Sequence, residues 1–401
     1  MTKQPPGQSD ERFAYQRFDQ RLSVPFDYPV YFTHDLFHIE NPLLESVLDR
    51  RGEKRTHRAL VYVDAGVAEA HPGLAQQIKD YFHDRPQTME LTSSPDVIPG
   101  GEAAKRNWDL VKDIMWTIGN HHLDRHSFII AVGGGSVLDA VGFATSLVHR
   151  GLRIVRVPTT VLAQNDAGVG VKNGMDEHGA KNYVGTFSPP FAVLNDYRFL
   201  PTLSDRDWTG GVAEAFKVAI IKDADFFDRL CRRADDLHAR DQDAMEELVY
   251  RAATLHLEHI RDNGDPFEMG AARPLDFGHW AGHKLEAMSD YTMGHGQGVA
   301  VGIAVDACYA MRQKLITSDE LERILDGLSA CGLPVWDDLL EERTPDGVLV
   351  VLDGLNQFRE HLGGTLNVTL PDGIGRKVEV HQVYADGVEE AVAFLKERHA
   401  R

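Results

Sequence analysis

The chain has 401 residues, which exceeds the size at which single hydrophobic cores usually stop growing, so we expect two domains. Hydrophobic residues make up 43% of the sequence, enough for both cores. The net charge of −19 argues against a nucleic-acid-binding protein, because a phosphate-binding surface needs an excess of Lys and Arg.

The first half alternates short apolar, β-branched runs with helical runs. The predicted strands cover 60–64, 128–132 and 154–157, and the predicted helices between them cover 73–84, 103–121 and 136–149. This alternation is typical of βαβ units and a parallel sheet. We therefore expect an α/β domain over 21–200, preceded by a loosely ordered extension over 1–20.

Long amphipathic stretches replace this alternation after Pro201. The predicted helices cover 211–232, 243–262, 276–289, 296–314, 318–330 and 385–398, with one short strand at 366–370. We therefore place a domain boundary near residue 200 and expect a mainly helical second domain over 201–401. The last 80 or so residues show no chemical motif.

Cysteine usage and hydropathy indicate where the protein resides. Cys231, Cys308 and Cys331 cannot all pair and show no CxxC spacing, which indicates inert thiols in a reducing compartment. The N-terminus lacks an apolar signal core, and no stretch approaches the ~20 apolar residues of a membrane span. We expect a cytoplasmic protein without a membrane or nucleic-acid partner.

A glycine-rich turn is the first chemical motif. Gly133–Gly135 directly follows a predicted strand and precedes a helix that opens at Ser136, so backbone N–H groups and the helix dipole can face a pyrophosphate. Asp139 is close enough to bind a ribose or nicotinamide group. Asp64 ends a predicted strand, where an acid can bind ribose hydroxyls. The loop at 99–105 leads into a predicted helix, as the glycine turn does. A plain loop at the glycines, and a helix N-cap or turn role for Asp64, remain alternatives.

A second motif combines 157–160, 166–174 and 179–182. Polar and basic residues stand among glycines there, in what we expect to be loops at the end of the sheet, where α/β enzymes bind ligands. Lys172, Lys181 and Asn182 can clamp a phosphate. A solvated loop with ordinary lysines is the alternative.

One glutamate and two histidines form the third motif: Glu214, His279 and His295. Two neutral imidazoles and one carboxylate bind a divalent metal and leave a position open for a substrate oxygen, which is the catalytic pattern. His283 lies four residues after His279 on one predicted helix, so both can face one pocket. Such a pair can also be two core or surface histidines.

In order and spacing, these motifs resemble the 3-dehydroquinate synthase superfamily, the sugar phosphate cyclases, from about Leu60 to about Ala310. The resemblance implies a Rossmann-like, NAD-binding N-terminal domain and a mainly helical, metal-binding C-terminal domain, with the active site between them. It also implies NAD and Zn²⁺ or Co²⁺ as cofactors, and a homodimer.

The resemblance assigns roles to individual residues. It implies that Glu214, His279 and His295 bind the metal. The residues it places around NAD are Asp64, Glu102, Lys105, Gly133, Gly134, Gly135, Asp139, Thr159, Thr160, Lys181 and Thr202. The residues it places at the substrate are Asp166, Lys172, Lys181, Asn182, Lys217, Arg273, Asp276 and His283, with Arg150 from the other subunit.

Departures from the family pattern indicate the substrate. A 3-dehydroquinate synthase has Asn where this chain has Asp276, and a carboxylate there repels an anionic group. The lysine that holds the substrate carboxylate has no equivalent, because no lysine lies between Lys222 and Lys284. The C-terminal lysine pair is also missing, and Arg359 is the nearest cation. A small ketose phosphate without a carboxylate fits better.

The Asp-Phe-Gly-His motif that begins at Asp276 resembles that of the cyclitol synthases that act on sedoheptulose 7-phosphate. The 2-epi-5-epi-valiolone synthases carry proline near the position of His283, so its retention favours the 2-epi-valiolone type or a sister group of cyclases. The implied reaction is transient oxidation, phosphate elimination, re-reduction and intramolecular aldol addition.

Three alternatives remain open. A 3-dehydroquinate synthase shares the motifs. A metal-dependent polyol or glycerol-type dehydrogenase shares the architecture, but the phosphate-clamp residues Lys172, Lys181 and Asn182 argue against it. A non-enzymatic ligand sensor is disfavoured by the intact metal triad.

Overall fold

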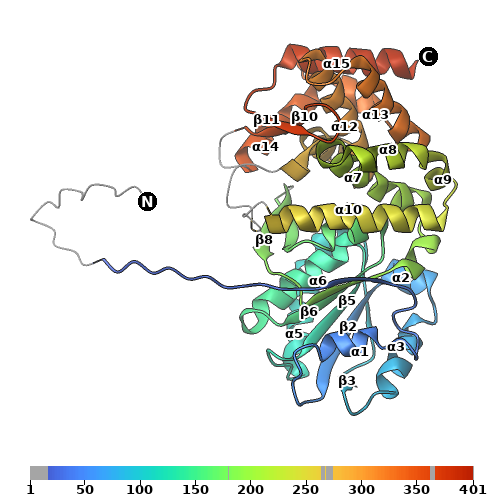
Figure 1. The fold of residues 1–401 in the computed structure, drawn as a ribbon. Coiled ribbons are helices and arrows are strands. Elements are labelled where there is room, and N and C mark those ends of the chain that lie inside the picture. Colours follow the sequence, from blue (N-terminus) through green and yellow to red (C-terminus); the bar gives the residue numbers. More distant parts are fainter. Residues whose placement is uncertain (1–16, 179, 263–266, 268–273, 362–365, 401) are drawn as a thin grey trace, which may run out of the picture.

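The computed structural model describes residues 17–178, 180–262, 267, 274–361 and 366–400 (Figure 1). In its lower half, as drawn there, lies a parallel sheet in the order β1-β9-β6-β5-β2-β3, with β4 also beside β2. The strands are β1 (Val30–Thr33), β2 (His57–Asp64), β3 (Met89–Leu91), β4 (Asp96–Ile98), β5 (Phe128–Gly133), β6 (Arg153–Pro158) and β9 (Ala192–Asp196). All six residues of β5 are buried, as expected of a central strand covered on both faces.

Helices cover both faces of this sheet. They are α1 (Leu43–Leu48), α2 (Ala65–Ala70), α3 (Leu74–His83), α4 (Glu102–Lys105), α5 (Trp108–Asn120) and α6 (Gly135–Leu147). Helices α1 and α3 pack in one apolar cluster, and α5 and α6 pack in another. The predicted Rossmann-like parallel sheet is therefore confirmed. The helix expected over 103–121 is divided, because Asn107 caps α5 by accepting a hydrogen bond from the backbone N–H of Leu110 at 3.0 Å.

The second half is mainly helical, as predicted, and forms the upper part of Figure 1. Its helices are α7 (Asp205–Lys222), α8 (Ala224–Arg232), α9 (Ala234–His238), α10 (Gln242–Asp262), α11 (His279–Met288), α12 (His295–Arg312), α13 (Ser318–Ala330), α14 (Asp353–His361) and α15 (Ala385–His399). The helix predicted over 211–232 is divided at Asp223, which caps α8. The strand expected at 366–370 is β10 (Val368–Pro371), paired with β11 (Lys377–Val380). The domain boundary near residue 200 stays a prediction.

Residues 172–187 differ from the expectation of loops. They form an antiparallel hairpin of β7 (Lys172–Glu177) and β8 (Ala180–Phe187). The fully buried guanidinium of Arg156 supports its base, because Nη1 donates to the carbonyls of Gly168 and Gly170 and Nη2 donates to that of Lys172. The hairpin therefore holds its polar side chains on a defined frame.

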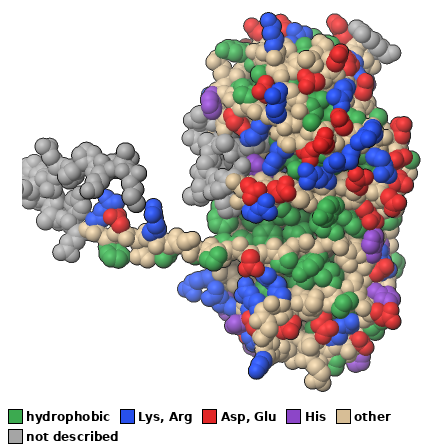
Figure 2. Space-filling model, viewed as in Figure 1, with side chains coloured by type: hydrophobic (Ala, Val, Ile, Leu, Met, Phe, Trp, Pro, Cys, Tyr) green, Lys and Arg blue, Asp and Glu red, His purple; other side chains and the backbone are tan. Residues whose placement is uncertain are grey.

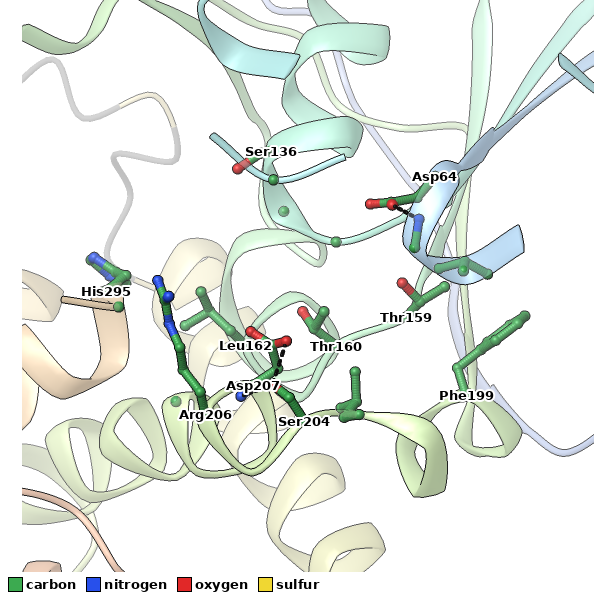
Figure 3. A pocket seen from close by; sticks show the side chains of 18 of the residues that line it. Asp64, Ser136, Thr159, Thr160, Leu162, Phe199, Ser204, Arg206, Asp207 and His295 are labelled. Carbon is green, nitrogen blue, oxygen red and sulfur yellow. Dashed lines mark hydrogen bonds between the residues drawn. The ribbon is translucent and has the colours of Figure 1, made fainter. Parts of the chain in front are cut away.

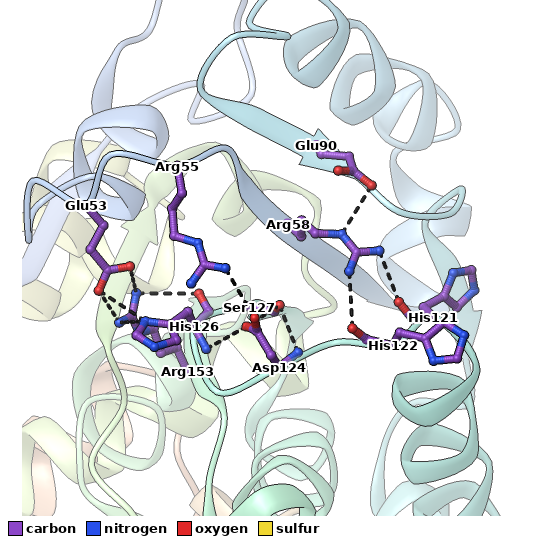
Figure 4. A network of polar contacts seen from close by, with 10 residues as sticks. All are labelled: Glu53, Arg55, Arg58, Glu90, His121, His122, Asp124, His126, Ser127 and Arg153. Carbon is purple, nitrogen blue, oxygen red and sulfur yellow. Dashed lines mark hydrogen bonds and ion pairs between the residues drawn. The ribbon is translucent and has the colours of Figure 1, made fainter.

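A network of polar contacts lies at the end of the sheet where strands β2, β5 and β6 begin (Figure 4). Arg153 pairs with Glu53, and Arg58 pairs with Glu90 at 3.3 Å. The guanidinium of Arg58 also donates to the carbonyls of the residues that follow α5. These charges stabilise the end of the sheet opposite the glycine turn. No helix among the described residues is long and apolar enough to cross a membrane.

Candidate active site

A pocket of about 380 Å³ lies where the strands end at the glycine turn, between the sheet and the helical half (Figure 3). Asp64 from the end of β2, Ser136 from the start of α6, and Thr159 and Thr160 after β6 line its sheet side. His295, at the start of α12, lines the opposite side. One cavity therefore joins the predicted nucleotide motif to a predicted metal ligand.

The glycine turn is packed too closely for side chains. A Cβ at Gly133 would lie 2.8 Å from Val137 Cγ1, and one at Gly134 would lie 3.3 Å from Thr160 Cγ2. Because α6 begins at Gly135, the unpaired N–H groups of its first turn face the pocket, as in a pyrophosphate site. Thr159 Oγ1 is buried and has no hydrogen-bond partner in the described part of the chain, so it can donate to a ligand. These features fit a bound dinucleotide.

The pocket includes most of the residues expected around NAD. Those that line it are Asp64, Glu102, Gly134, Gly135, Thr159, Thr160 and Thr202. One carboxylate oxygen of Asp64 also accepts a hydrogen bond from the N–H of Gly66 at 2.8 Å, so Asp64 caps the N-terminus of α2. The other carboxylate oxygen is available to a ligand in the pocket.

Four residues that were expected around NAD do not line the pocket: Gly133, Lys105, Asp139 and Lys181. Lys105 is buried, and its ammonium lies 2.8 Å from Asp139 Oδ2 and also contacts Asn182 Oδ1. These three side chains tie α4, α6 and β8 together beside the pocket. The physical reason is that a buried ammonium requires an anionic partner, which the partly buried Asp139 supplies.

Glycine contacts between helices bring the three predicted metal ligands together. A side chain at Gly296 of α12 would collide with the backbone of Gly210 in α7. A Cβ at Gly298 of α12 would lie 2.9 Å from the carbonyl oxygen of Gly282 in α11. Helices α7, α11 and α12 therefore approach at backbone distance, which places Glu214, His279 and His295 around one point.

The donor atoms converge as a metal site requires. Glu214 Oε1 lies 3.2 Å from His295 Nε2 and 3.6 Å from His279 Nε2. His279 Nδ1 donates to the carbonyl of Phe277 at 3.1 Å, and His295 Nδ1 donates to Glu286 Oε1 at 2.9 Å. Because each Nδ1 is engaged, each Nε2 is directed to Glu214. Two imidazole nitrogens and a carboxylate oxygen suit Zn²⁺ or Co²⁺ with a position left open.

His283 stands beside this cluster. Its ring centroid lies 5.2 Å from that of His279 and 5.5 Å from that of His295, and one nitrogen from each of the three rings lies within 4.8 Å of the others. Burial lowers the pKa of His283 well below its usual value, and His279 lowers it further. A neutral His283 can therefore contact a ligand or serve as a further donor.

A network of charged side chains surrounds Glu214. Lys217, one turn along α7, pairs with Glu214, and its Nζ lies 3.5 Å from Asp166 Oδ1. His256 of α10 reaches the same Asp166 oxygen at 2.8 Å. Burial raises the pKa of Glu214, but Lys217, His279 and a hydrogen bond from His295 together lower it to about 2, so Glu214 is an anion. Burial lowers the pKa of Lys217, but Asp166 and Glu214 raise it above its ordinary value.

Two members of the cluster, Glu286 and His256, were missed from the sequence. Glu286 is 2% exposed, and it accepts from His295 and pairs with Lys181 of β8. It lies seven residues after His279 on α11, a spacing that repeats one helix face and was the available signal. His256 lies in a long amphipathic helix with no motif to mark it.

The comparisons with known proteins agree with this geometry. The family model described as 3-dehydroquinate synthase N-terminal matches residues 96–210, and that described as 3-dehydroquinate synthase C-terminal matches residues 211–349. The 2-epi-valiolone synthase of Actinosynnema mirum is 34% identical over 380 residues, which are 94% of this chain and 94% of that protein. The chain belongs to the 3-dehydroquinate synthase family. It is a sugar phosphate cyclase, an enzyme of the phosphate-eliminating lyase type, as predicted.

Another relative and two solved structures extend the comparison. The 3-dehydroquinate synthase of Rhizobium rhizogenes is 34% identical over 313 residues, 77% of this chain and 81% of that protein. ValA, a 2-epi-5-epi-valiolone synthase from Streptomyces hygroscopicus solved with NAD⁺ and Zn²⁺, superposes with a TM-score of 0.83 at 30% identity, over 95% of this chain and 100% of ValA. A 2-deoxy-scyllo-inosose synthase solved with carbaglucose-6-phosphate, NAD⁺ and Co²⁺ shares the fold, with a TM-score of 0.72 at 21% identity over 91% and 96% of the two chains.

Four residues expected at the substrate of this sugar phosphate cyclase are not joined to the metal cluster by the contacts described above. Arg150 is exposed near the far end of α6 from the glycine turn, and that helix is about 20 Å long. Lys172 begins β7 with an exposed side chain. Arg273 lies outside the described residues. Asp276 ends a short 3₁₀ helix (Pro274–Asp276), and its charge helps to raise the pKa of Lys217.

Proposed function

We propose that the chain is an NAD- and divalent-metal-dependent cyclase that converts sedoheptulose 7-phosphate to a cyclitol of the 2-epi-valiolone type. The observation that carries the proposal is the position of His295, which lies between Glu214 and Glu286 and also lines the pocket of the glycine turn. A substrate carbon between the metal and the nicotinamide is then within reach of both. The 2-epi-valiolone synthase of Actinosynnema mirum supports this activity, and ValA, a 2-epi-5-epi-valiolone synthase with NAD⁺ and Zn²⁺ bound, supports a valiolone-type cyclase that uses these cofactors.

The residues of the site fit the proposed chemistry. When bound, NAD supplies a hydride acceptor and then a donor, and Zn²⁺ or Co²⁺ supplies a Lewis acid. Glu214, His279 and His295 hold the metal, and Thr159 and the N–H groups before Ser136 orient the dinucleotide. Lys217, Asp166 and His283 lie where substrate hydroxyls must be held and where protons must move.

The charges favour a substrate without a carboxylate. Lys217, which lies one turn along α7 from Glu214, is paired with that buried carboxylate. Asp276 adds a further negative charge near Lys217. The carboxylate of the 3-dehydroquinate precursor would meet repulsion here, whereas the hydroxyls of a heptulose phosphate can bond to the same groups.

We also propose a homodimer in the cytoplasm. Arg150 is too far along α6 to reach the pocket of its own chain, so a role for it at the substrate phosphate requires a second copy. Lys172, Lys181 and Asn182 are the other residues proposed to hold the phosphate.

A balance of products tests the proposed reaction. The full chain is incubated with NAD⁺, Zn²⁺ and sedoheptulose 7-phosphate, and inorganic phosphate and NADH are followed together. The proposal predicts stoichiometric phosphate without net NADH, because the cofactor is regenerated in each turnover. Net NADH with a simple polyol, and no phosphate from the heptulose phosphate, would instead identify a polyol dehydrogenase.

A further inference from the structure

Residues 18–27 have a strand-like pattern that the catalytic site does not use. Apolar side chains stand at every even position from 18 to 26 except Gln20, namely Phe18, Leu22, Val24 and Phe26. The odd positions between 19 and 27 hold charged residues, serine and proline. A period of two places alternate side chains on opposite faces, so this pattern is typical of a strand with one face buried.

The structure leaves that apolar face uncovered. Phe18, Leu22, Val24 and Phe26 are 87, 77, 66 and 59% exposed. Figure 1 shows the segment leaving the body as an extended ribbon. It is attached near its end, where Arg50 Nη1 lies 3.0 Å from Asp27 Oδ2 and the ring of Phe26 lies 5.8 Å from that of Phe267. We call residues 17–27 the N-terminal arm.

A matching apolar surface lies beside the base of the arm. β1 is an edge strand, and among the described strands it pairs only with β9. Tyr31 of β1 and Tyr250 of α10 are 37 and 55% exposed, and the rings of Phe32 and Tyr250 are 5.0 Å apart. Figure 2 shows hydrophobic side chains gathered across the middle of this face, between α10 and the N-terminal segment. We call β1 and the adjoining surface of α10 the β1–α10 band.

The arm is poorly suited to fold back onto its own band. Tyr28 and Pro29 alone separate it from β1, and neither is a residue that two-residue hairpin turns favour. The hydroxyl of Tyr28 also donates to the carbonyl of Val169 at 2.9 Å, which fixes the chain in its extended course. From that point the eleven residues of the arm reach at most about 40 Å, enough to cross onto a neighbouring molecule.

We propose that the arm binds the β1–α10 band of a second copy of the chain, and that two copies exchange arms reciprocally. This inference rests on the proposed homodimer and names its contact surface. The arm adds a strand to the free edge of β1, and its even-numbered side chains cover the apolar band. Pro25 is compatible with this role, because a strand added at the edge needs no donor on its outer side.

The area is sufficient for a stable dimer. A buried aromatic ring removes about 150–250 Å² from water, and each arm offers two such rings as well as Leu22 and Val24. Two reciprocal arms and the surfaces that they cover therefore reach the roughly 1,200–2,000 Å² of ordinary specific interfaces. The arm also offers backbone hydrogen bonds along β1.

A pair of neighbouring substitutions tests the contact in the full-length protein. Leu22→Asp places a charge on the apolar face, and Ser23→Asp places the same charge on the opposite face. We expect the dimer dissociation constant, measured by analytical ultracentrifugation, to rise about 100-fold in Leu22→Asp, because each dimer carries two substituted sites. Ser23→Asp should change it by less than about threefold, since its side chain points to solvent.

The outcomes distinguish a failure of the arm exchange from a failure of the homodimer. A wild-type chain that stays monomeric at all concentrations would overturn both the homodimer and the arm exchange. A wild-type dimer whose dissociation constant is unchanged by Leu22→Asp would overturn the arm exchange and leave the homodimer standing. A photoreactive benzoylphenylalanine at Phe18 should cross-link two chains, at peptides of β1 or α10; cross-links only within one chain would also overturn the exchange.

Discussion

Glu286 Oε1 accepts a hydrogen bond of 2.9 Å from Nδ1 of His295, whose Nε2 lies 3.2 Å from Glu214. The carboxylate fixes the ring orientation and places the free nitrogen toward the metal. Lys181 of the β7–β8 hairpin pairs with Glu286 in turn. The metal site of the helical half is therefore connected to the β7–β8 hairpin through a buried carboxylate.

The first prediction concerns Glu286 as a positioning residue. Glu286→Gln keeps the shape of the side chain but loses the charge that holds His295 and Lys181. We expect Zn²⁺ affinity to fall about 10–100-fold, as for other residues that orient metal ligands. Competition with a chromophoric chelator measures it. Glu322→Gln, which removes an exposed partner of Arg398, is the control and should bind Zn²⁺ as the wild type does.

The second prediction separates the metal ligands from His283. His279→Ala and Glu214→Ala should lose bound metal and phosphate release together. His283→Ala should retain metal, because Glu214 already approaches both Nε2 atoms, while phosphate release falls about 100-fold or more from the loss of a proton-transfer or orienting group. Elemental analysis of the purified variants measures the bound metal and so shows which side chains hold it. Metal loss in His283→Ala with retention in Glu214→Ala would assign the third ligand to His283 instead.

The third prediction concerns the glycine contact between α11 and α12. A Cβ at Gly302 would collide with the carbonyl of Gly278, so Gly302→Ala must separate the helices that carry His279 and His295. We expect a loss of about 1–3 kcal/mol of unfolding free energy and weaker metal binding. Gly119→Ala is the matched control, because its added methyl group meets no atom within 4 Å. The control should be neutral or stabilising in urea unfolding.

The fourth prediction concerns acid stability at the Glu53–Arg153 pair. The hydrogen bond from Arg153 lowers the pKa of Glu53 from 4.5 to about 2 in the folded protein. A lowered folded pKa stabilises the protein above the unfolded value, so this contribution is complete above pH 4.5 and disappears as pH falls toward 2. Urea unfolding of wild type and Glu53→Gln should differ most at neutral pH and converge near pH 2. A constant difference across that range would contradict it.

The sequence predicts the elements whose signals are local. The turn at Gly133–Gly135 follows an apolar strand and needs no partner to be recognised, and the helices that carry Glu214 and His295 lie in long stretches rich in apolar residues. The β7–β8 hairpin was missed because its glycines and lysines interrupt any apolar alternation, and it is stabilised by Arg156 from a distant strand.

The missed and misplaced site residues have a common cause. The Lys105–Asp139 pair joins α4 to α6, and the Glu286–Lys181 pair joins α11 to β8. Each depends on which elements pack together, which no local spacing encodes. The metal triad itself was recognised through its resemblance to a family rather than through its spacing, since 81 residues separate Glu214 from His295.

Phosphate release from two substrates tests the central claim most directly. The enzyme with NAD⁺ and Zn²⁺ receives, in separate reactions, sedoheptulose 7-phosphate and the carboxylated precursor of 3-dehydroquinate. The repulsion expected from Asp276 and the pairing of Lys217 with Glu214 predict release from the heptulose phosphate alone. Release from the carboxylated substrate alone would contradict the account and identify a 3-dehydroquinate synthase.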